Sequence, residues 1–372
     1  MTTRKYYITF YKLVKTFLFI FSKNWGILLL IKKGVNMNKL VIPENYKSNE
    51  DLYKTQLLIK EIKDYFQINL ANNLNLKRVT APLFVSGSSG LNDNLNGVET
   101  PVKFDLPEAD HAEMEIVHSL AKWKRYALGE YKFKMHEGLY TDMNAIRRCE
   151  VPDNTHSFYV DQWDWELIMD DDERKVDYLK QIVETIYRTM KSLDEYLCTL
   201  IPSRKKLLKD QITFMTSEEL LQKYPDKTAK EREREAVLEY GSVFLMQIGK
   251  TLSNGEKHDL RAPDYDDWQL NGDILVYNPV LDDCLEISSM GIRVNPERLN
   301  EQLKLTGNLD RLNLDYHKLL IDGKLPQTIG GGIGQSRLCM FFLQKAHIGE
   351  VQVSYWPDEQ RKALASKGIN LL

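Results

Sequence analysis

The chain has 372 residues, of which 43% are hydrophobic and 28% are charged, as in a globular protein that buries one large core or two modest ones. This composition excludes a disordered or a collagen-like protein. The formal net charge is −3, but residues 37–372 hold 43 basic against 53 acidic residues, and a charge of −10 argues against nucleic-acid binding.

The first 36 residues differ from the rest because they contain seven lysines or arginines and no acidic residue. Their apolar stretch, 17–31, is interrupted by Lys23 and Asn24, is short for a membrane span and lacks a small-residue cleavage site. A membrane anchor is the alternative, but the abrupt composition shift favours a true start at Met37. We expect residues 1–36 to lie outside the fold and 37–372 to form a single catalytic domain.

The cysteines lie far apart and form no C-x-x-C pair: Cys149, Cys198, Cys284 and Cys339. This pattern fits reduced, structural thiols in a cytoplasmic protein. None has the sequence context of a nucleophile, so we expect no thiol that could release ammonia from glutamine.

Helix and strand signals are interleaved in the first half of the chain. A capping box at Ser48 and helical apolar spacing predict a helix over 49–70. Strands are predicted over 76–85 and 113–118, and the second is followed by a helix that Ser119 caps and that ends near Gly129. Over 171–200, a three-four alternation of apolar residues predicts a long helix with one buried stripe, either a core face or a dimer seam.

The second half is predicted to contain strands at 211–215, 243–248, 273–280, 284–294 and 350–356, and helices at 296–305 and 337–344. Strict β-α-β alternation is rare. We therefore expect an α+β fold with a mainly antiparallel central sheet flanked by helices.

The glycine-rich segment 330–337 matches neither of the common phosphate-binding motifs. It lacks the Lys-Ser/Thr of a P-loop, and Arg337 replaces the third glycine of a dinucleotide fingerprint. What remains is a strand that turns through glycines, lets a flat ligand approach its backbone and starts a helix. Arg337 on that helix could stack on adenine and reach a triphosphate.

Two further segments combine polar and apolar residues in a regular pattern. In the helix after His118, Lys122 and Arg125 are on neighbouring positions of one face, although a solvated basic face explains this spacing more simply. In segment 161–166, strand alternation places Gln162, Asp164 and Glu166 on one face and both tryptophans, with Asp161, on the other. This suits a small polar ligand or, alternatively, a half-exposed strand.

Acidic residues also gather in two later segments. Segment 261–268 joins Arg261 to three carboxylates, as in a surface turn or a magnesium-nucleotide site. In segment 284–293, alternation places Glu286 with Ser288, and Ser289 with Arg293 on the opposite face if no bulge intervenes. A glutamate in an apolar strand lowers the stability of the fold unless its charge is paired or binds a metal ion. The seven histidines show no metal-ligand spacing, and we interpret them as structural.

Seven segments, in order, resemble the signature of ammonia-dependent asparagine synthetase (aspartate–ammonia ligase): HSLAKWKR, EGLYTDMNAIR, VDQWDWE, RAPDYDDW, NGDILVYNPV, EISSMGIRV and PQTIGGGIGQSR. The resemblance spans roughly Tyr46 to Trp356, with a shorter stretch than expected between Trp268 and Asn271. It implies a homodimer whose catalytic domain is similar to that of class II aminoacyl-tRNA synthetases. In the implied reaction, the β-carboxylate of aspartate attacks the α-phosphorus of ATP, and ammonia then displaces AMP from the β-aspartyl adenylate.

The resemblance also implies roles for individual residues. ATP and Mg²⁺ are the implied cofactors, because cations must offset the repulsion between a carboxylate and a triphosphate. Nucleotide-binding candidates are Arg147, Arg261, Asp273, Glu286, Ser288 and Arg337, with Asp273 and Glu286 toward Mg²⁺ or ribose. Aspartate-binding candidates are Asp93, Lys122, Gln162, Asp164, Ser289 and Arg293. Catalytic candidates are Lys122, Arg147 and Asp266, the last as proton acceptor for ammonia; Arg148, in Arg148-x-Glu150, is the alternative to Arg147.

The main alternative is a class II aminoacyl-tRNA synthetase paralogue that activates an amino acid for another acceptor. Such a protein should have a basic tRNA surface and usually a second domain, and the sequence shows neither. A regulatory relative that only binds asparagine or AMP should have lost charged ligands. A glutamine-dependent enzyme would need an amidotransferase domain. We therefore expect ammonia as the donor, and neither a nucleic acid nor a membrane as a partner.

Overall fold

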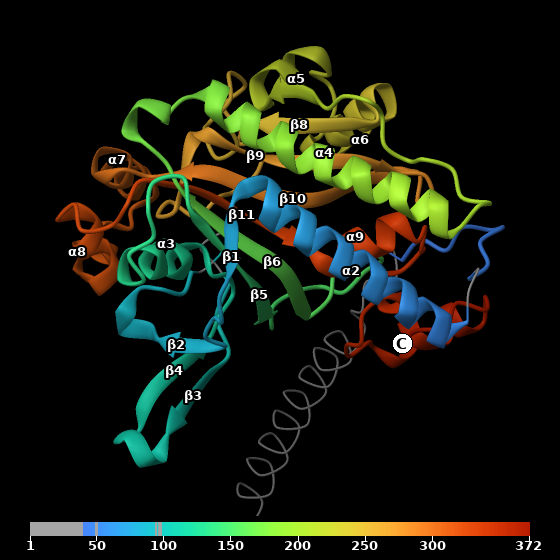
Figure 1. Cartoon of the computed structure of the whole chain (residues 1–372), viewed down its shortest axis with the longest axis horizontal. Coiled ribbons are helices and arrows are strands. Elements are labelled where there is room, and N and C mark those ends of the chain that lie inside the picture. Colours follow the sequence, from blue (N-terminus) through green and yellow to red (C-terminus); the bar gives the residue numbers. More distant parts are fainter. Residues whose placement is uncertain (1–39, 49–50, 94, 96–98) are drawn as a thin grey trace, which may run out of the picture.

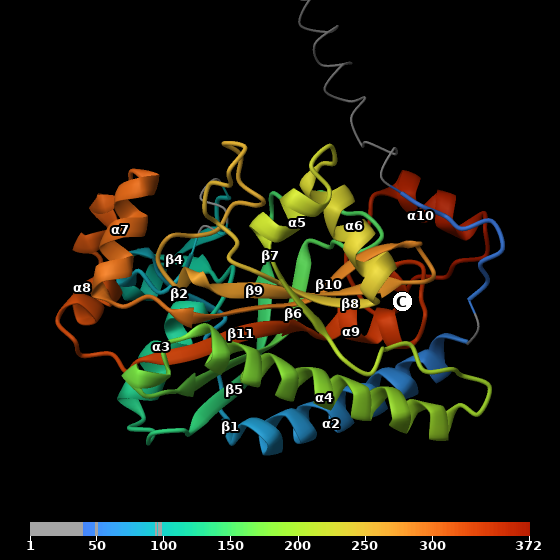
Figure 2. The same ribbon diagram turned by 90° about the horizontal axis from the view of Figure 1, so that it is seen from above.

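The computed structural model describes residues 40–48, 51–93, 95 and 99–372, so the expected boundary at Met37 lies outside the described residues. Within them, one large sheet has helices on both faces, and a small three-stranded sheet extends away from it (Figures 1 and 2). No helix in these ranges is long and apolar enough to cross a membrane.

The large sheet has eight strands in the order β1 (Leu76–Arg78), β5 (Gly138–Ile146), β6 (Tyr159–Ile168), β11 (Thr328–Gly334), β10 (Asp283–Arg293), β9 (Asp266–Asn278), β8 (Ser242–Met246) and β7 (Thr213–Thr216). Only the two outer pairs, β1 with β5 and β7 with β8, are parallel. The mainly antiparallel α+β fold is thus confirmed. The small sheet has the order β2 (Phe84–Ser86), β4 (Ala112–Ile116) and β3 (Lys103–Leu106).

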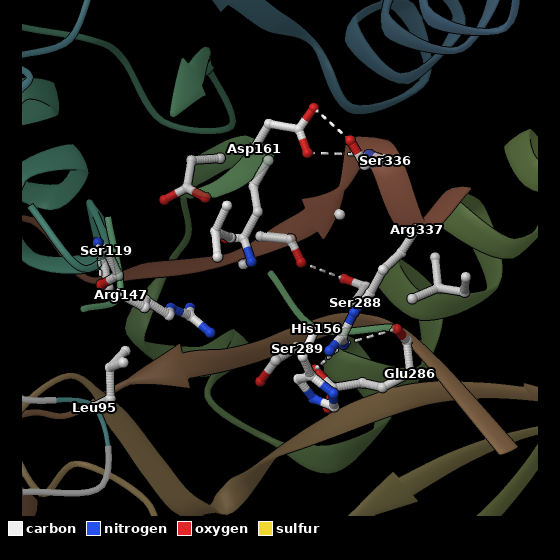
Figure 3. A pocket seen from close by; sticks show the side chains of 18 of the residues that line it. Leu95, Ser119, Arg147, His156, Asp161, Glu286, Ser288, Ser289, Ser336 and Arg337 are labelled. Atoms are coloured by element: carbon white, nitrogen blue, oxygen red, sulfur yellow. Dashed lines mark hydrogen bonds and ion pairs between the residues drawn. The ribbon is translucent and has the colours of Figure 1, made fainter. Parts of the chain in front are cut away.

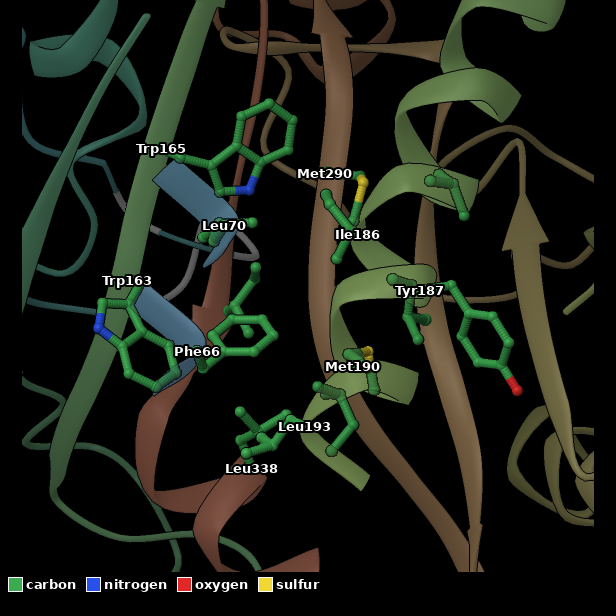
Figure 4. Close-up of a cluster of buried hydrophobic side chains, with 14 of the residues drawn as sticks. Phe66, Leu70, Trp163, Trp165, Ile186, Tyr187, Met190, Leu193, Met290 and Leu338 are labelled. Atoms are coloured by element: carbon green, nitrogen blue, oxygen red, sulfur yellow. The ribbon is translucent and has the colours of Figure 1, made fainter. Parts of the chain in front are cut away.

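One face of the large sheet carries the main hydrophobic core. It is covered by α2 (Leu52–Leu74), α4 (Val176–Leu200) and α9 (Gln335–Phe342). Trp163 and Trp165 of β6 point into this core, and the Trp163 ring lies 5.0 Å from that of Phe66 on α2 (Figure 4). The predicted stripe of α4, including Ile186 and Met190, is buried here, so it is a core face.

The opposite face is covered only at its two ends. At one end α3 (Ala121–Glu130) packs over β5 and β6, and at the other α5 (Ser217–Lys223) contacts β7 while α6 (Ala229–Tyr240) covers β8 to β10. The remaining α-helices of the described residues are α7 (Pro296–Thr306), α8 (Asp315–Ile321) and α10 (Asp358–Ala365). Polar side chains therefore occupy the middle of this face.

Several predicted boundaries were wrong. The strand over 76–85 is divided into β1 and β2, and the intervening Pro82 has no N–H to donate to a ladder. The strand at 350–356 is absent: a 3₁₀ turn at Ile348–Glu350 ends in irregular backbone that pairs with no strand of either sheet. Asp51, not Ser48, caps α2 by accepting from Lys54 N. β9 includes the short stretch between Trp268 and Asn271, but its pairing with β10 shifts register there, between Asn271 and Asp266.

Candidate active site

A cavity of about 370 Å³ opens on the uncovered middle of the sheet (Figure 3). Its walls come from β6, β10, β11, the loop after β5 and segment 259–266. It brings together most of the residues proposed from the sequence: Arg147, Gln162, Asp164, Arg261, Asp266, Glu286, Ser288, Ser289, Arg293 and Arg337. Asp93, Lys122 and Asp273 do not line it.

The polar face of β6 and the glycines of β11 fit each other in register. Gly332 pairs with Asp164, and Gly330 pairs with Glu166. A Cβ atom on Gly332 would come within 2.8 Å of Asp164 Oδ1 and even closer to Gln162 Oε1. The glycines therefore make room for the acidic and amide side chains of the neighbouring strand, a role that the sequence-based interpretation of a ligand approach did not include.

At the centre of one wall, Arg293 is fully buried between two carboxylates. Its Nε and Nη2 donate to the two oxygens of Glu166 at 2.9 and 2.7 Å, and its Nη1 donates to Asp266. Burial alone would raise the pKa of Glu166, but Arg293 holds it below its usual value. At Asp266 burial dominates and raises the pKa, with Glu166 adding to the rise and Arg293 opposing it.

The structure places Lys124, not Lys122, in the cavity. Lys124 Nζ lies 3.1 Å from Asp164 Oδ2 and donates to Gly331 O at 2.8 Å. Burial, only partly offset by Asp164, lowers the pKa of Lys124. Lys122 is two positions earlier and so points about 200° away around α3, where it pairs with the buried Asp264. The motif was identified correctly, but a single sequence does not show which lysine faces the sheet.

Arginines and acids alternate at the other end of the cavity. Arg261 donates to Asp273, which lies behind it, and Arg337 Nη1 lies 3.7 Å from Glu286 Oε1. Burial and the proximity of Glu286 raise the pKa of Asp273 to about 7, against the opposing effect of Arg261. No cluster of three or more metal-binding side chains occurs among the described residues, so a cation here would need further ligands.

A bulge in β10 corrects the predicted alternation. The pairing of β10 with β9 shifts register between Glu286 and Ser288, and as a result Glu286, Ser289 and Arg293 all line the cavity. The Ser288 hydroxyl donates to Gly332 O at 2.9 Å and thus joins β10 to β11.

Three polar residues support or extend the walls. Asp93 is buried and accepts from the Ser119 hydroxyl and, at 2.8 Å, from Leu95 N, so it lies behind the lining residue Ser119. Asp161 accepts from Ser336 N and Oγ at 3.2 and 2.9 Å. His156, interpreted from the sequence as structural, lines the cavity (Figure 3). Its Nδ1 lies 2.9 Å from Asp153 Oδ1.

Comparisons with known proteins agree with this geometry. Residues 53–368 match the family model described as aspartate-ammonia ligase. A relative named aspartate–ammonia ligase from Clostridium tetani is 58% identical over 334 residues, covering 90% of this chain and 98% of the relative. A relative of the same name from Ruminiclostridium cellulolyticum is 56% identical over 336 residues, covering 90% of this chain and 100% of the relative.

Solved structures show the fold. Asparaginyl-tRNA synthetase from Entamoeba histolytica superposes with a TM-score of 0.58 at 16% identity, covering 83% of this chain and 68% of that one. Asparaginyl-tRNA synthetase from Pyrococcus horikoshii, complexed with asparaginyl-adenylate, superposes with a TM-score of 0.59 at 15% identity. The match covers 82% of this chain and 70% of that one. The fold is therefore that of the class II aminoacyl-tRNA synthetases.

Proposed function

The chain belongs to the aspartate–ammonia ligase family and is therefore a ligase that uses ATP to form asparagine from aspartate and ammonia; we propose that it does so through a β-aspartyl-adenylate. In the first step an oxygen of the β-carboxylate bonds to the α-phosphorus while pyrophosphate leaves. In the second, the ammonia nitrogen bonds to the carbon of the β-carboxyl group, the acyl C–O bond to the phosphate breaks and AMP leaves.

The main observation behind this proposal is one cavity whose two ends are lined by different sets of charged and polar side chains. Of the lining residues, Lys124, Gln162, Asp164 and Arg293 lie close to one another at one end, and Arg261, Glu286 and Arg337 lie close to one another at the other. The first set suits a small amino acid with two carboxylates and one ammonium group. The second set suits a nucleotide with phosphates and a ribose.

We assign the first end to aspartate. Asp164 Oδ1 is buried and lacks a hydrogen-bond partner among the described residues, so it can accept from the substrate ammonium group, with Asp93 adding negative charge behind Ser119. Lys124 and Arg293 hold carboxylate oxygens, and Gln162 and Ser289 orient them. Lys122 is withdrawn from this set because it does not line the cavity and its ammonium group pairs with Asp264 instead.

We assign the second end to ATP. Arg337 and Arg261 contact the base and the phosphates, and Arg147, from the loop after β5, also lines the cavity. His156 faces the same end. The Ser288 hydroxyl is held by Gly332 O, so its contribution is to fix the floor of the site.

The residues present fit a magnesium ion bound together with phosphates. Glu286 lines the cavity, where its carboxylate could reach such an ion. Asp273 lies behind Arg261 and does not line the cavity, but its Oδ1 is buried and has no hydrogen-bond partner among the described residues. Mg²⁺ commonly takes one or two carboxylates plus phosphate oxygens. When bound, it would offset the negative charge of the phosphates.

Asp266 is the proposed proton acceptor when ammonium becomes the nucleophile. Its carboxylate lines the cavity, and burial raises its pKa, which makes it a better base than an ordinary aspartate. Arg293, in contact with the same carboxylate, keeps it oriented.

The test uses aspartate labelled with ¹⁸O in its β-carboxylate, together with Mg-ATP and ammonium. An adenylate mechanism transfers one ¹⁸O to AMP, with asparagine and pyrophosphate as the other products. Formation of ADP and phosphate, or AMP without label, would exclude it. Replacement of ammonium by glutamine should give little asparagine.

We further propose a cytoplasmic homodimer without a nucleic-acid partner. The outer side of α2 exposes apolar side chains at helical spacing, with Tyr53 73%, Leu57 47% and Ile68 56% exposed. A Tyr53→Glu/Leu57→Glu variant should sediment as a monomer, whereas the unaltered chain should sediment as a dimer. A monomeric unaltered chain would contradict the proposal.

A further inference from the structure

The segment that carries Asp266 is anchored by a fully buried carboxylate next to it, that of Asp264. Its Oδ2 accepts from Lys122 Nζ at 3.1 Å, from Arg311 Nη1 at 3.0 Å and from His317 Nε2 at 3.0 Å. The Asp264 and His317 side chains are 0% exposed and that of Lys122 is 2% exposed. Burial opposes ionisation of Asp264, but Lys122, His317 and Arg311 outweigh it and hold its pKa far below the usual value.

These partners come from separate parts of the fold. Lys122 belongs to α3, Arg311 to the 3₁₀ helix Leu309–Asn313 and His317 to α8. The Asp264 carboxylate is therefore a single point at which three elements are attached to segment 261–266.

The same elements carry residues of the cavity. Tyr265 and Asp266 follow Asp264 directly and both line the cavity, as does Lys124, two residues after Lys122. The backbone of the segment is also held by Gln302, whose Nε2 donates to Pro263 O and Asp266 O at 3.0 Å each. Through its ion pair with Lys122, Asp264 thus connects α3, which places Lys124 in the cavity, to segment 261–266, which places Asp266 there.

We propose that Asp264 is a positioning residue for the ligation reaction, which sets Lys124 and Asp266 at a fixed separation across the aspartate end of the cavity. It touches no substrate itself. This inference rests on the proposed assignment of that end to aspartate. The nucleotide end depends on it much less, because Arg261 has its own partners, Asp259 and Asp273.

A positioning role differs from mere support of the fold in its kinetic effect. Loss of the Asp264 charge leaves Lys122 buried and unpaired, so the segment shifts. A displacement of about 1 Å at reacting groups can cost about 100-fold in rate. The loss should therefore appear in kcat and in the KM for aspartate, while the KM for ATP stays the same.

The experiment compares Asp264→Asn with Asp194→Asn, measured well below the melting transitions of both variants. Asp194 is an equally buried acid, outside the cavity, that accepts from Arg204 and from the backbone of Leu207 and Leu208. Asp264→Asn should lower kcat/KM for aspartate by about 10- to 100-fold. Asp194→Asn should lower the melting temperature but leave both KM values and the kcat per folded molecule unchanged.

If Asp264→Asn does not fold, Lys122→Met provides a second test. In that variant Asp264 is still held by Arg311 and His317. Lys122→Met should show the same selective loss for aspartate. Kinetic constants equal to those of the unaltered chain, or parallel changes in both KM values, would overturn the positioning role. Absence of asparagine formation by the unaltered chain would instead overturn the proposed function.

Discussion

Arg293 and Glu166 form a two-point ion pair inside the protein, with side chains 2% and 0% exposed. Arg293 also contacts Asp266, so one guanidinium group joins β10, β6 and the start of β9 on the cavity wall. The pair gives the proposed aspartate site a rigid cationic group, and its loss should affect stability as well as activity.

Glu166→Gln should lower the free energy of unfolding by about 3 to 5 kcal/mol, because it leaves a buried guanidinium group with one charged partner fewer. Urea denaturation measures this. Glu137→Gln is the control, since Glu137 pairs with Lys77 at the surface, where solvent screens the charges. Similar losses in the two variants would show that burial adds nothing to the Arg293–Glu166 pair.

Lys124→Met should reduce kcat/KM for aspartate by about 100-fold or more, since it removes the buried ammonium group beside Asp164 and misplaces the substrate. Steady-state assays of asparagine formation test this. Lys362→Met, on the exposed surface of α10, should have wild-type kinetics. If the Lys124→Met enzyme were fully active, Lys124 would not be part of the aspartate-binding site.

Gly332→Ala should cost activity because its Cβ would displace Gln162 and Asp164 from the cavity wall. We expect about a 100-fold fall in kcat/KM for aspartate. The matched variant is Gly129→Ala in α3, whose Cβ would contact Pro326 Cδ at an ordinary distance of 3.5 Å. Because alanine favours a helix more than glycine does, this variant should be more stable by about 0.5–1 kcal/mol. Equal activity in the two variants would contradict the proposed fit between β6 and β11.

The stability of the protein should fall as the pH drops from 6.5 toward 4, with a contribution from His347. Burial lowers the pKa of His347 to about 4, its Nδ1 accepts from Gly349 N, and its ring packs on Trp356. Because the unfolded chain binds the proton more tightly, the neutral side chain contributes up to about 3 kcal/mol above pH 6.5, and this is lost as the pH falls through that range.

Melting temperatures of the unaltered chain and of His347→Gln, taken across this pH range, test the contribution. The variant should be less stable at pH 7 and should show a flatter pH dependence. Parallel curves would mean that His347 does not titrate differently in the folded and unfolded states.

Much of the architecture followed from local sequence patterns. The alternation in 161–166 placed the tryptophans in the core and Gln162 and Asp164 on the opposite face, as the structure has them. The stripe of α4 was also predicted correctly. Such patterns are reliable because side-chain direction depends on backbone periodicity alone. The ordered motifs likewise indicated the family that the comparisons show.

The tertiary structure decided which of the candidate residues meet. Lys122 and Lys124 stand in one motif, and only the rotation of α3 against the sheet directs Lys124 into the cavity and Lys122 toward Asp264. The bulge in β10 brings Glu286 and Ser289 to one face, which alternation alone does not allow. The sequence by itself therefore determined the family, the sheet and the faces of its regular elements. Helix rotation, strand register and partner choice depend on contacts between distant segments, and only the folded chain sets them.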